Sequence, residues 1–166
     1  MATAENLKEA FAGESQANRK YMAFAKKADA EGYPQIARLF RATAEAETVH
    51  ANAHLRALNG VRGTLENLET AIAGEHYEFT EMYPKFLEIA RDEGHQAAQT
   101  AFEYALAVEK VHHGLYEKAL ETLRQGKDLD VRPVYVCPVC GHTVIGEAPD
   151  KCPICGVPKN KFAEIK

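Results

Sequence analysis

The sequence predicts a mainly helical protein, in which a bundle of four long helices precedes a small metal-binding domain with short strands. Residues 4–124 are rich in Ala, Glu, Leu and Lys, and their apolar residues recur at helical spacing. After Lys127 the composition changes to Pro, Val, Cys and Gly, with short β-like runs such as residues 134–136. We therefore expect a bundle domain over residues 1–127 and a second domain over residues 131–166.

Helix-stop signals divide the first domain. Glycine just past a helix end and proline shortly after it are typical of helix termini. Such breaks occur at Gly32 to Pro34, at Asn59 to Thr64, at Glu93-Gly94 and at Gln125-Gly126. They predict helices over residues 4–31, 34–59, 65–93 and 95–125.

An internal repeat relates the first two helices to the last two. Ala-Gly-Glu ending at Glu14 matches Ala-Gly-Glu ending at Glu75, and the segment Glu47–His50 matches Glu109–His112. The offset is 61 residues at the first match and 62 from the match of Tyr21 with Tyr83 onwards, so one extra residue lies between Glu75 and Tyr83. Helices commonly absorb a single inserted residue as a π-bulge, often at a functional site. We predict such a bulge in the third helix.

The repeat puts candidate metal ligands on all four helices. A Glu lies on the first and third helices, and a Glu-x-x-His pair, whose members share a helix face, lies on the second and fourth. Four buried carboxylates need compensating charge, which two cations supply. Carboxylate and imidazole ligands suit iron or manganese, and this constellation is typical of dimetal sites in ferritin-like bundles. The predicted ligands are Glu14, Glu47, His50, Glu75, Glu109 and His112.

Further side chains adjoin this set. Glu78 lies three residues after Glu75 on the same helix face, and the matching part of the first helix has no acid, so Glu78 breaks the symmetry as a seventh ligand. Tyr21 and Tyr83 occupy matched positions about two turns after Glu14 and Glu75, where each either packs in the core or hydrogen-bonds a ligand carboxylate. Four histidines have no matching partner in the repeat, and we interpret them as surface or packing residues: His54, His76, His95 and His113.

The second domain contains two Cys-x-x-Cys-Gly turns. Each turn can direct two thiolates and several backbone N–H groups at one metal, and two turns complete a tetrahedral sulfur site. In a reducing cytosol this pattern favours a metal over disulfides. The turns alone leave iron and zinc open, whereas their coupling to a redox-capable bundle favours iron. The predicted ligands are Cys137, Cys140, Cys152 and Cys155.

Charge and hydropathy argue against two classes of partner. The net charge is −4 and Lys and Arg are scattered, so there is no basic footprint for nucleic acid. No apolar run is long enough to span a bilayer, and the N-terminal residues do not resemble a signal peptide. We expect a cytoplasmic protein.

Taken together, these motifs resemble the rubrerythrin family over essentially the whole chain. The resemblance rests on Gly13–Ala17, Glu47–His50, Gly74–Glu78, Glu81–Pro84, Glu109–His112 and the two cysteine turns. It implies a ferritin-like four-helix bundle with two irons, bridged by carboxylates, followed by a rubredoxin-like domain with one cysteine-bound iron.

The resemblance also implies individual roles. Glu47 and Glu109 would bridge the irons, Glu14 would be a terminal ligand of one iron, and Glu75 and His112 would be terminal ligands of the other. His50 and Glu78 would form an exchanging pair, with one iron moving between them as its oxidation state changes. The side chains expected to take part in catalysis are Glu78, His50, Tyr21 and Tyr83.

The family's activity implies reduction of hydrogen peroxide to water. Electrons would come one at a time through the cysteine-bound iron from an external reductase or small electron carrier. Three alternatives are an iron-oxidising storage protein, an oxygen-activating diiron oxidase, and a binding adaptor with a structural zinc ribbon and a vestigial bundle. The complete ligand set argues against the adaptor.

The connection between the second and third helices is short. Roughly six residues span at most about 20 Å, whereas a crossover along a ferritin-like bundle climbs about 30 Å. Either the bundle is a simple up-down-up-down one, or the first helix pair of one chain packs with the second pair of another chain. We favour the second arrangement, a domain-swapped homodimer, because it keeps the family's site with a short linker.

Overall fold

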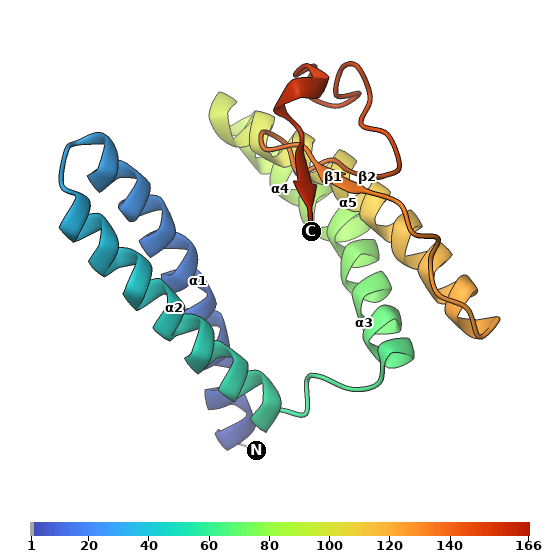
Figure 1. Ribbon diagram of the computed structural model, residues 1–166, viewed down its shortest axis with the longest axis horizontal. Coiled ribbons are helices and arrows are strands. Elements are labelled where there is room, and N and C mark those ends of the chain that lie inside the picture. Colours follow the sequence, from blue (N-terminus) through green and yellow to red (C-terminus); the bar gives the residue numbers. More distant parts are fainter. Residues whose placement is uncertain (1) are drawn as a thin grey trace. The chain divides into compact units, whose positions relative to one another are not determined.

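The computed structural model describes residues 2–166, which form two compact units (Figure 1). The first unit ends at Arg62 and the second runs from Gly63 to Lys166. Both are mainly helical, and the short strands all belong to the C-terminal part of the second unit. The predicted fold class, a helical bundle followed by a small strand-containing metal domain, is confirmed.

The first unit is a hairpin of α1 (Ala2–Ala30) and α2 (Pro34–Ala57). Gly32 turns the chain with a φ of +84°, a backbone conformation that favours glycine. The N–H of Tyr33 then donates to the carbonyl of Ala28 at 2.9 Å, and Pro34 starts α2 at a position where its missing N–H costs nothing. Both helices lie within two residues of their predicted ranges.

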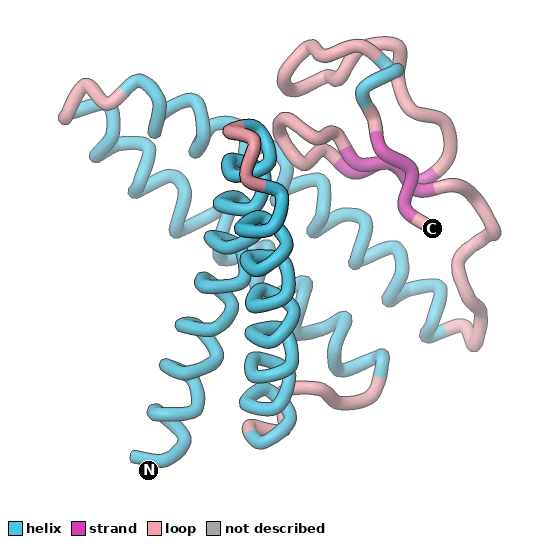
Figure 2. The backbone as a smooth tube through the Cα atoms, turned by 60° about the vertical axis from the view of Figure 1, so that its left-hand side comes forward, coloured by secondary structure: helices cyan, strands magenta, loops and turns pink. Residues whose placement is uncertain are grey.

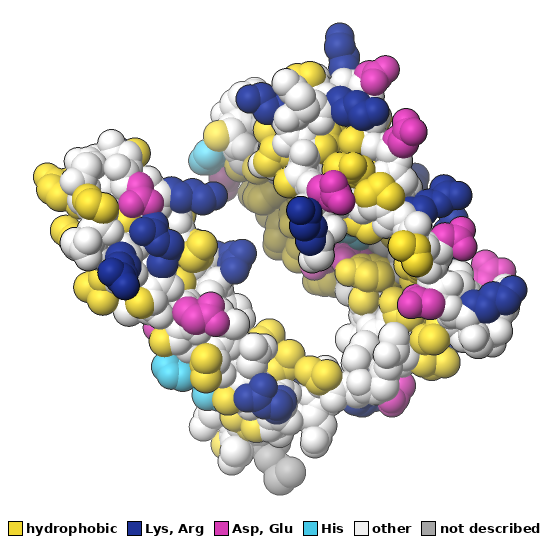
Figure 3. All heavy atoms as spheres, in the orientation of Figure 1, with side chains coloured by type: hydrophobic (Ala, Val, Ile, Leu, Met, Phe, Trp, Pro, Cys, Tyr) yellow, Lys and Arg dark blue, Asp and Glu magenta, His cyan; other side chains and the backbone are white. Residues whose placement is uncertain are grey.

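Small and polar residues join the two helices of this hairpin. Ala25, Ala28 and Ala37 form its buried cluster, against which Phe40 packs. The large apolar side chains lie instead on the surface of the unit: Met22, Phe24, Ile36, Leu39 and Val49. Figure 3 shows hydrophobic side chains between charged ones on one face of this unit. The hairpin therefore exposes large apolar side chains that its own interface does not bury.

The second unit begins with α3 (Thr64–Tyr77), the π-helical segment η1 (Glu78–Met82) and α4 (Tyr83–Asp92). The N–H of Tyr83 donates to the carbonyl of Glu78, five residues earlier, which is the hydrogen bond of a π-turn. The predicted bulge between Glu75 and Tyr83 is confirmed. After Gly94, α5 (Gln96–Arg124) packs against α3 and α4.

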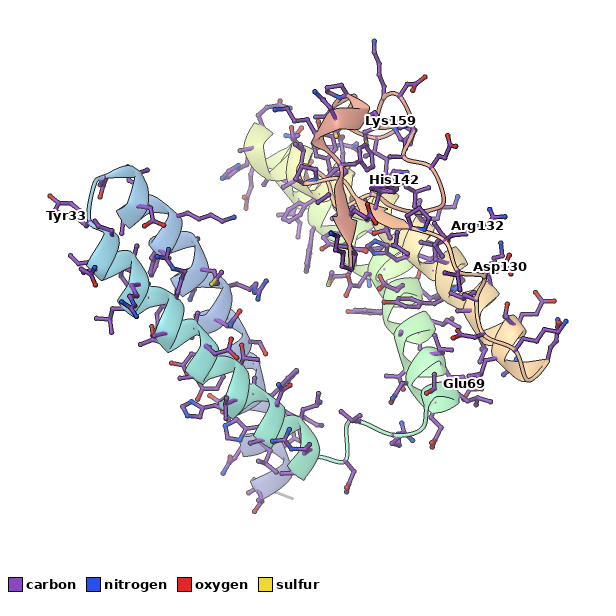
Figure 4. All side chains as sticks on the ribbon, in the orientation of Figure 1. Tyr33, Glu69, Asp130, Arg132, His142 and Lys159 are labelled. Carbon is purple, nitrogen blue, oxygen red and sulfur yellow. The ribbon has the colours of Figure 1, made fainter. Side chains whose placement is uncertain are left out.

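The C-terminal strands form a small antiparallel sheet in the order β2-β1-β3 (Figure 2). They are β1 (Val134–Val136), β2 (Thr143–Ile145) and β3 (Ala163–Ile165), with the short helix η2 (Lys159–Lys161) before β3. The connection from α5 to β1 runs back beside α5, and Figure 4 labels Asp130 and Arg132 on it.

This connection contains the domain boundary predicted between residues 127 and 131, and the boundary stays a prediction. Only Met1 of the predicted domains lies outside the described residues. Across residues 2–166, no helix is long and apolar enough to cross a membrane.

Candidate metal centres

The first unit brings three of the predicted ligands together. The ligand atoms of Glu14, Glu47 and His50 all lie within 4.8 Å of one another. His50 Nδ1 is 2.9 Å from Glu47 Oε2 and 3.9 Å from Glu14 Oε1. We call these three residues half-site 1.

Asn18 fixes the two helices that carry half-site 1. It is buried one turn after Glu14, and its Nδ2 donates to the carbonyl of Ala44 at 2.6 Å and to the hydroxyl of Thr48 at 2.8 Å. Its Oδ1 accepts from the guanidinium of Arg19 at 2.8 Å. Because Thr48 follows Glu47 directly, this buried amide sets the spacing of the two carboxylates.

The second unit repeats the same geometry. The ligand atoms of Glu75, Glu109 and His112 also lie within 4.8 Å of one another, and we call these residues half-site 2. His112 Nδ1 is 2.7 Å from Glu109 Oε2 and 3.9 Å from Glu75 Oε2. The sequence repeat thus reappears as two matching sets of two carboxylates and one imidazole.

Half-site 2 holds a concentration of negative charge that a cation would relieve. Burial, the charge of Glu109 and a hydrogen bond with Glu109 raise the pKa of Glu75. Burial and the charge of Glu75 raise the pKa of Glu78, which lies at the start of η1 beside the half-site. Oxygen ligands crowded in this way suit a metal ion, which replaces the protons that the carboxylates would otherwise share.

The two predicted tyrosines occupy equivalent aromatic clusters. Tyr21 packs with Phe24 and Phe40, at ring-centroid distances of 6.3 Å to each. Tyr83 packs in the same way with Phe86 and Phe102, at 6.4 and 6.1 Å. Burial and the charges of Glu78, Glu109 and Glu75 raise the pKa of Tyr83, so its phenol lies near the carboxylates of half-site 2.

The four cysteines converge in the C-terminal domain as free thiols. Cys137 Sγ is 3.5 Å from Cys155 Sγ, and Cys140 Sγ is 3.5 Å from Cys152 Sγ. A disulfide requires about 2.05 Å, whereas sulfurs bound at about 2.3 Å to one tetrahedral metal lie about 3.8 Å apart. The sulfur positions therefore fit a tetrahedral metal.

The two cysteine turns are built alike. The N–H of Gly141 donates to the carbonyl of Cys137, and the N–H of Gly156 donates to the carbonyl of Cys152, both at 2.9 Å. Burial raises the pKa of the Cys152 thiol, but the N–H groups of Cys155 and Ile154 outweigh it and lower that pKa to about 7. The second turn therefore favours the thiolate of Cys152, whereas burial raises the pKa of Cys140 and of Cys155, which a bound metal would have to deprotonate.

Comparison with known families assigns both parts of the chain. A family model described as "Rubrerythrin" matches residues 5–120, and one described as "Rubrerythrin, rubredoxin-like domain" matches residues 135–163. The chain belongs to the rubrerythrin family. Its ligand sets accordingly correspond to a diiron site of the ferritin-like bundle and a rubredoxin-like four-cysteine site.

Curated relatives match the rubrerythrin chain over nearly its full length. It is 39% identical to rubrerythrin-2 of Clostridium acetobutylicum over 174 residues, covering 96% of this chain and 95% of the relative. It is also 39% identical to nigerythrin of Nitratidesulfovibrio vulgaris, covering 97% and 85%. A solved structure of nigerythrin in a mixed-valence state aligns with a TM-score of 0.59, covering 98% of this chain and 86% of the other.

The structure also identifies residues that sequence reasoning missed. Asn18 is outside the predicted ligand set, yet its hydrogen bonds order half-site 1. Thr143 was not considered, although its hydroxyl lies 3.0 Å from Nε2 of the predicted ligand His112. Neither belongs to a recognisable motif, because each acts through a contact between distant parts of the sequence.

Proposed function

We propose that this rubrerythrin is a non-haem diiron peroxidase, which reduces hydrogen peroxide to water with electrons delivered through the cysteine-bound iron. The observation that carries the proposal is the direct contact of the four-cysteine domain with half-site 2, through Thr143 and His112. A storage protein needs no such built-in electron supply. An oxidative-stress role in a reducing compartment suits the four free thiols.

The overall reaction consumes one peroxide, two electrons and two protons and yields two waters. When reduced and bound, the iron pair supplies the two electrons that break the oxygen–oxygen bond. In our proposal, Glu14, Glu47, Glu75, Glu109 and His112 would hold the two metals. These roles agree with the paired geometry of the two half-sites.

Glu78 and His50 distinguish the two ends of the proposed site. We assign Glu78 the role of an anionic ligand that offsets the added positive charge after oxidation, in exchange with the imidazole of His50. His50 suits exchange because its side chain is 56% exposed, whereas that of His112 is 25% exposed. Tyr21 and Tyr83 are proposed to hydrogen-bond ligand carboxylates.

A comparison of oxidants tests the proposal. The fully reduced, iron-loaded protein is mixed with peroxide or with dissolved oxygen in a stopped-flow instrument, and oxidation of each iron centre is followed by absorbance. We expect peroxide to react faster by about 100-fold, equivalent to about 2.7 kcal/mol in barrier height. Equal or faster reaction with oxygen would instead support the oxidase, and iron mineralisation without peroxide turnover would support the storage protein.

The Glu78→Ala variant tests the seventh ligand. Loss of its anion should lower peroxide turnover by about 10- to 1000-fold, which is the range for removing one electrostatic stabiliser of a catalytic site. Glu81→Ala, a neighbouring acid paired with Lys85 at 2.9 Å, is the matched control and should keep normal turnover. Normal turnover in Glu78→Ala would refute the assigned role.

We further propose that the active protein is a homodimer in which α1 and α2 of one chain complete the site with α3 to α5 of the other. Half-sites 1 and 2 each supply three ligands, so neither is complete alone. Residues 58–63 join α2 to α3, and they span at most about 20 Å. The surface-exposed apolar side chains of the α1–α2 hairpin also need a partner, and a second copy offers one.

A further inference from the structure

A continuous chain of hydrogen bonds runs from the cysteine turn to half-site 2, within the second unit. Thr143 Oγ1 lies 3.0 Å from His112 Nε2 and 3.0 Å from the carbonyl oxygen of Gly141. Gly141 directly follows Cys140, one of the four thiols. These contacts connect the backbone next to Cys140 to the imidazole of His112, a predicted iron ligand.

The donor and acceptor directions along these hydrogen bonds fit a metal-bound imidazole. His112 directs Nδ1 at the carboxylates of half-site 2, so metal binding at Nδ1 leaves the ring proton on Nε2. Nε2–H then donates to the Thr143 hydroxyl, and the hydroxyl donates to the carbonyl of Gly141. Each group thus has a suitable partner, and the contact selects one tautomer of His112.

Packing holds the cysteine turn against α5 at the same place. Gly141 has a φ of +86°, and a Cβ added to it would lie 3.7 Å from Cγ1 of Val108, which is almost fully buried. Val108 precedes Glu109 of half-site 2. Thr143 begins β2, where it pairs with Val136, and His142 before it is also buried; Figure 4 labels His142 in this domain. The hydroxyl is therefore presented by a packed element.

We propose that Thr143 is a positioning residue that fixes the ring of His112. Through this contact, the cysteine-bound iron of one chain reduces the iron pair to which α5 of the same chain contributes ligands. The inference rests on the proposed function. In each transfer, ferrous iron at the four-cysteine site is oxidised to ferric iron, and one ferric iron of the pair is reduced to ferrous iron. Two transfers per peroxide restore the pair, and the external electron donor re-reduces the cysteine-bound iron.

The two half-sites differ in the way this role requires. His112 is held at both ring nitrogens, by Glu109 and by Thr143. In the described part of the chain, His50 forms its side-chain hydrogen bond at Nδ1, with Glu47. A ring held on both sides provides fixed electronic contact, whereas a ring held on one side can move. The hydroxyl thus marks His112 as the stationary imidazole.

The test compares Thr143→Val, which removes the hydroxyl but keeps the shape, with Thr143→Ser, which restores a hydroxyl. Thr122→Val is the matched control, since it removes a hydroxyl that donates to a helical carbonyl of α5, that of Lys118 at 2.8 Å. The reduced proteins are mixed with one equivalent of peroxide, and reoxidation of the cysteine-bound iron is followed by its visible absorbance. The midpoint potentials of both centres are measured in parallel.

We expect Thr143→Val to slow reoxidation of the cysteine-bound iron by about 10- to 100-fold, the usual effect of removing a hydrogen bond to a metal-bound histidine. The potential of the iron pair should shift as well, while Thr143→Ser and Thr122→Val stay close to the parent. Reoxidation at the parent rate in Thr143→Val would overturn the proposal. So would equal slowing by Thr143→Ser, because the hydroxyl would then not be the cause.

A second measurement separates this inference from the proposed function. In protein with zinc in the four-cysteine site and ferrous iron in the bundle, peroxide can oxidise the iron pair once. The zinc site cannot then return electrons to the pair. Peroxide should oxidise the pair at the same rate in the parent and in Thr143→Val. If peroxide fails to oxidise the pair in the parent, the peroxidase proposal fails. If only Thr143→Val slows this step, Thr143 acts on peroxide chemistry and the electron link is refuted.

Discussion

Glu75 and Glu109 lower the stability of the metal-free protein at neutral pH, and the same two carboxylates provide ligands for a metal. The two carboxylates share a hydrogen bond in a partly buried place, which requires a proton between them when no metal neutralises their charge. Burial and the charge of Glu109 therefore raise the pKa of Glu75 above 4.5, its ordinary value. A raised carboxyl pKa adds stability below pH 4.5, and this stability is lost as the pH rises through the raised value.

The variant Glu75→Gln tests this balance. An amide can donate the hydrogen bond to Glu109 without a proton from solvent, so metal-free protein should melt about 2–4 °C higher at neutral pH, as for a gain of about 1 kcal/mol in a chain of this size. Calorimetry should find the difference shrinking as the pH falls towards 4.5. Iron binding should weaken at the same time, because a neutral amide replaces a charged ligand.

Glu9→Gln is the control, since Glu9 is an exposed acid on α1 and its loss should leave both properties unchanged. A Glu75→Gln protein that melts at or below the temperature of the parent would contradict the prediction.

The π-turn η1 explains how α1 and the helix of Glu75 present equivalent side chains although the Glu-to-Tyr spacing differs by one residue. Tyr21 follows Glu14 by seven residues, which brings it within about 20° of the same helix face. Tyr83 follows Glu75 by eight residues, and in an uninterrupted α-helix it would lie about 80° away. The wider turn over Glu78–Met82 takes up the extra residue, so both tyrosines join equivalent aromatic clusters.

Deleting Thr80 tests what the π-turn contributes. Thr80 is an exposed residue whose hydroxyl bonds the carbonyl of His76 at 2.6 Å. The shortened helix should become regular, keep Tyr83 on the face of Glu75, and melt at or above the temperature of the parent. Glu78 should leave its place beside half-site 2, so peroxide turnover should drop to about the level of Glu78→Ala. Circular dichroism and turnover measure the two effects, and parent-level turnover would show that the π-turn is dispensable.

At the scale of the whole molecule, the division of ligands between two units makes the assembly testable. Half-site 1 belongs entirely to the unit that ends at Arg62, and half-site 2 to the unit that begins at Gly63. One chain can lose half-site 1 through Glu14→Gln with Glu47→Gln, and another can lose half-site 2 through Glu75→Gln with Glu109→Gln. Neither chain alone can then form a complete iron pair.

Mixed dimers of these two chains should regain one intact diiron site if the helix pairs are exchanged. The unaltered α1–α2 hairpin of one chain then meets the unaltered second unit of the other. Co-expression with two affinity tags isolates the mixed dimer, and iron analysis with absorbance spectroscopy counts its sites. An unswapped assembly would give no intact site, and a monomeric protein with full iron content would also reject the exchange.

Much of the fold and of the candidate site followed from the sequence because both depend on local periodicity. The glycine and proline breaks predicted the helix ranges, and the three-residue spacing within Glu47–His50 and Glu109–His112 put each pair on one helix face. The count of residues between Glu75 and Tyr83 was enough to predict the π-turn. Likewise, the spacing within each Cys-x-x-Cys-Gly turn predicted that the four sulfurs would form one site.

The sequence by itself determined which side chains could bind metal and which helix face each one shares, since a helix converts spacing along the chain into direction in space. The tertiary structure decided which elements meet: Asn18 buried against α2, and Thr143 of the C-terminal sheet bonded to His112 of α5. Such contacts join residues 26 and 31 positions apart, and they depend on how preformed elements pack rather than on any local pattern.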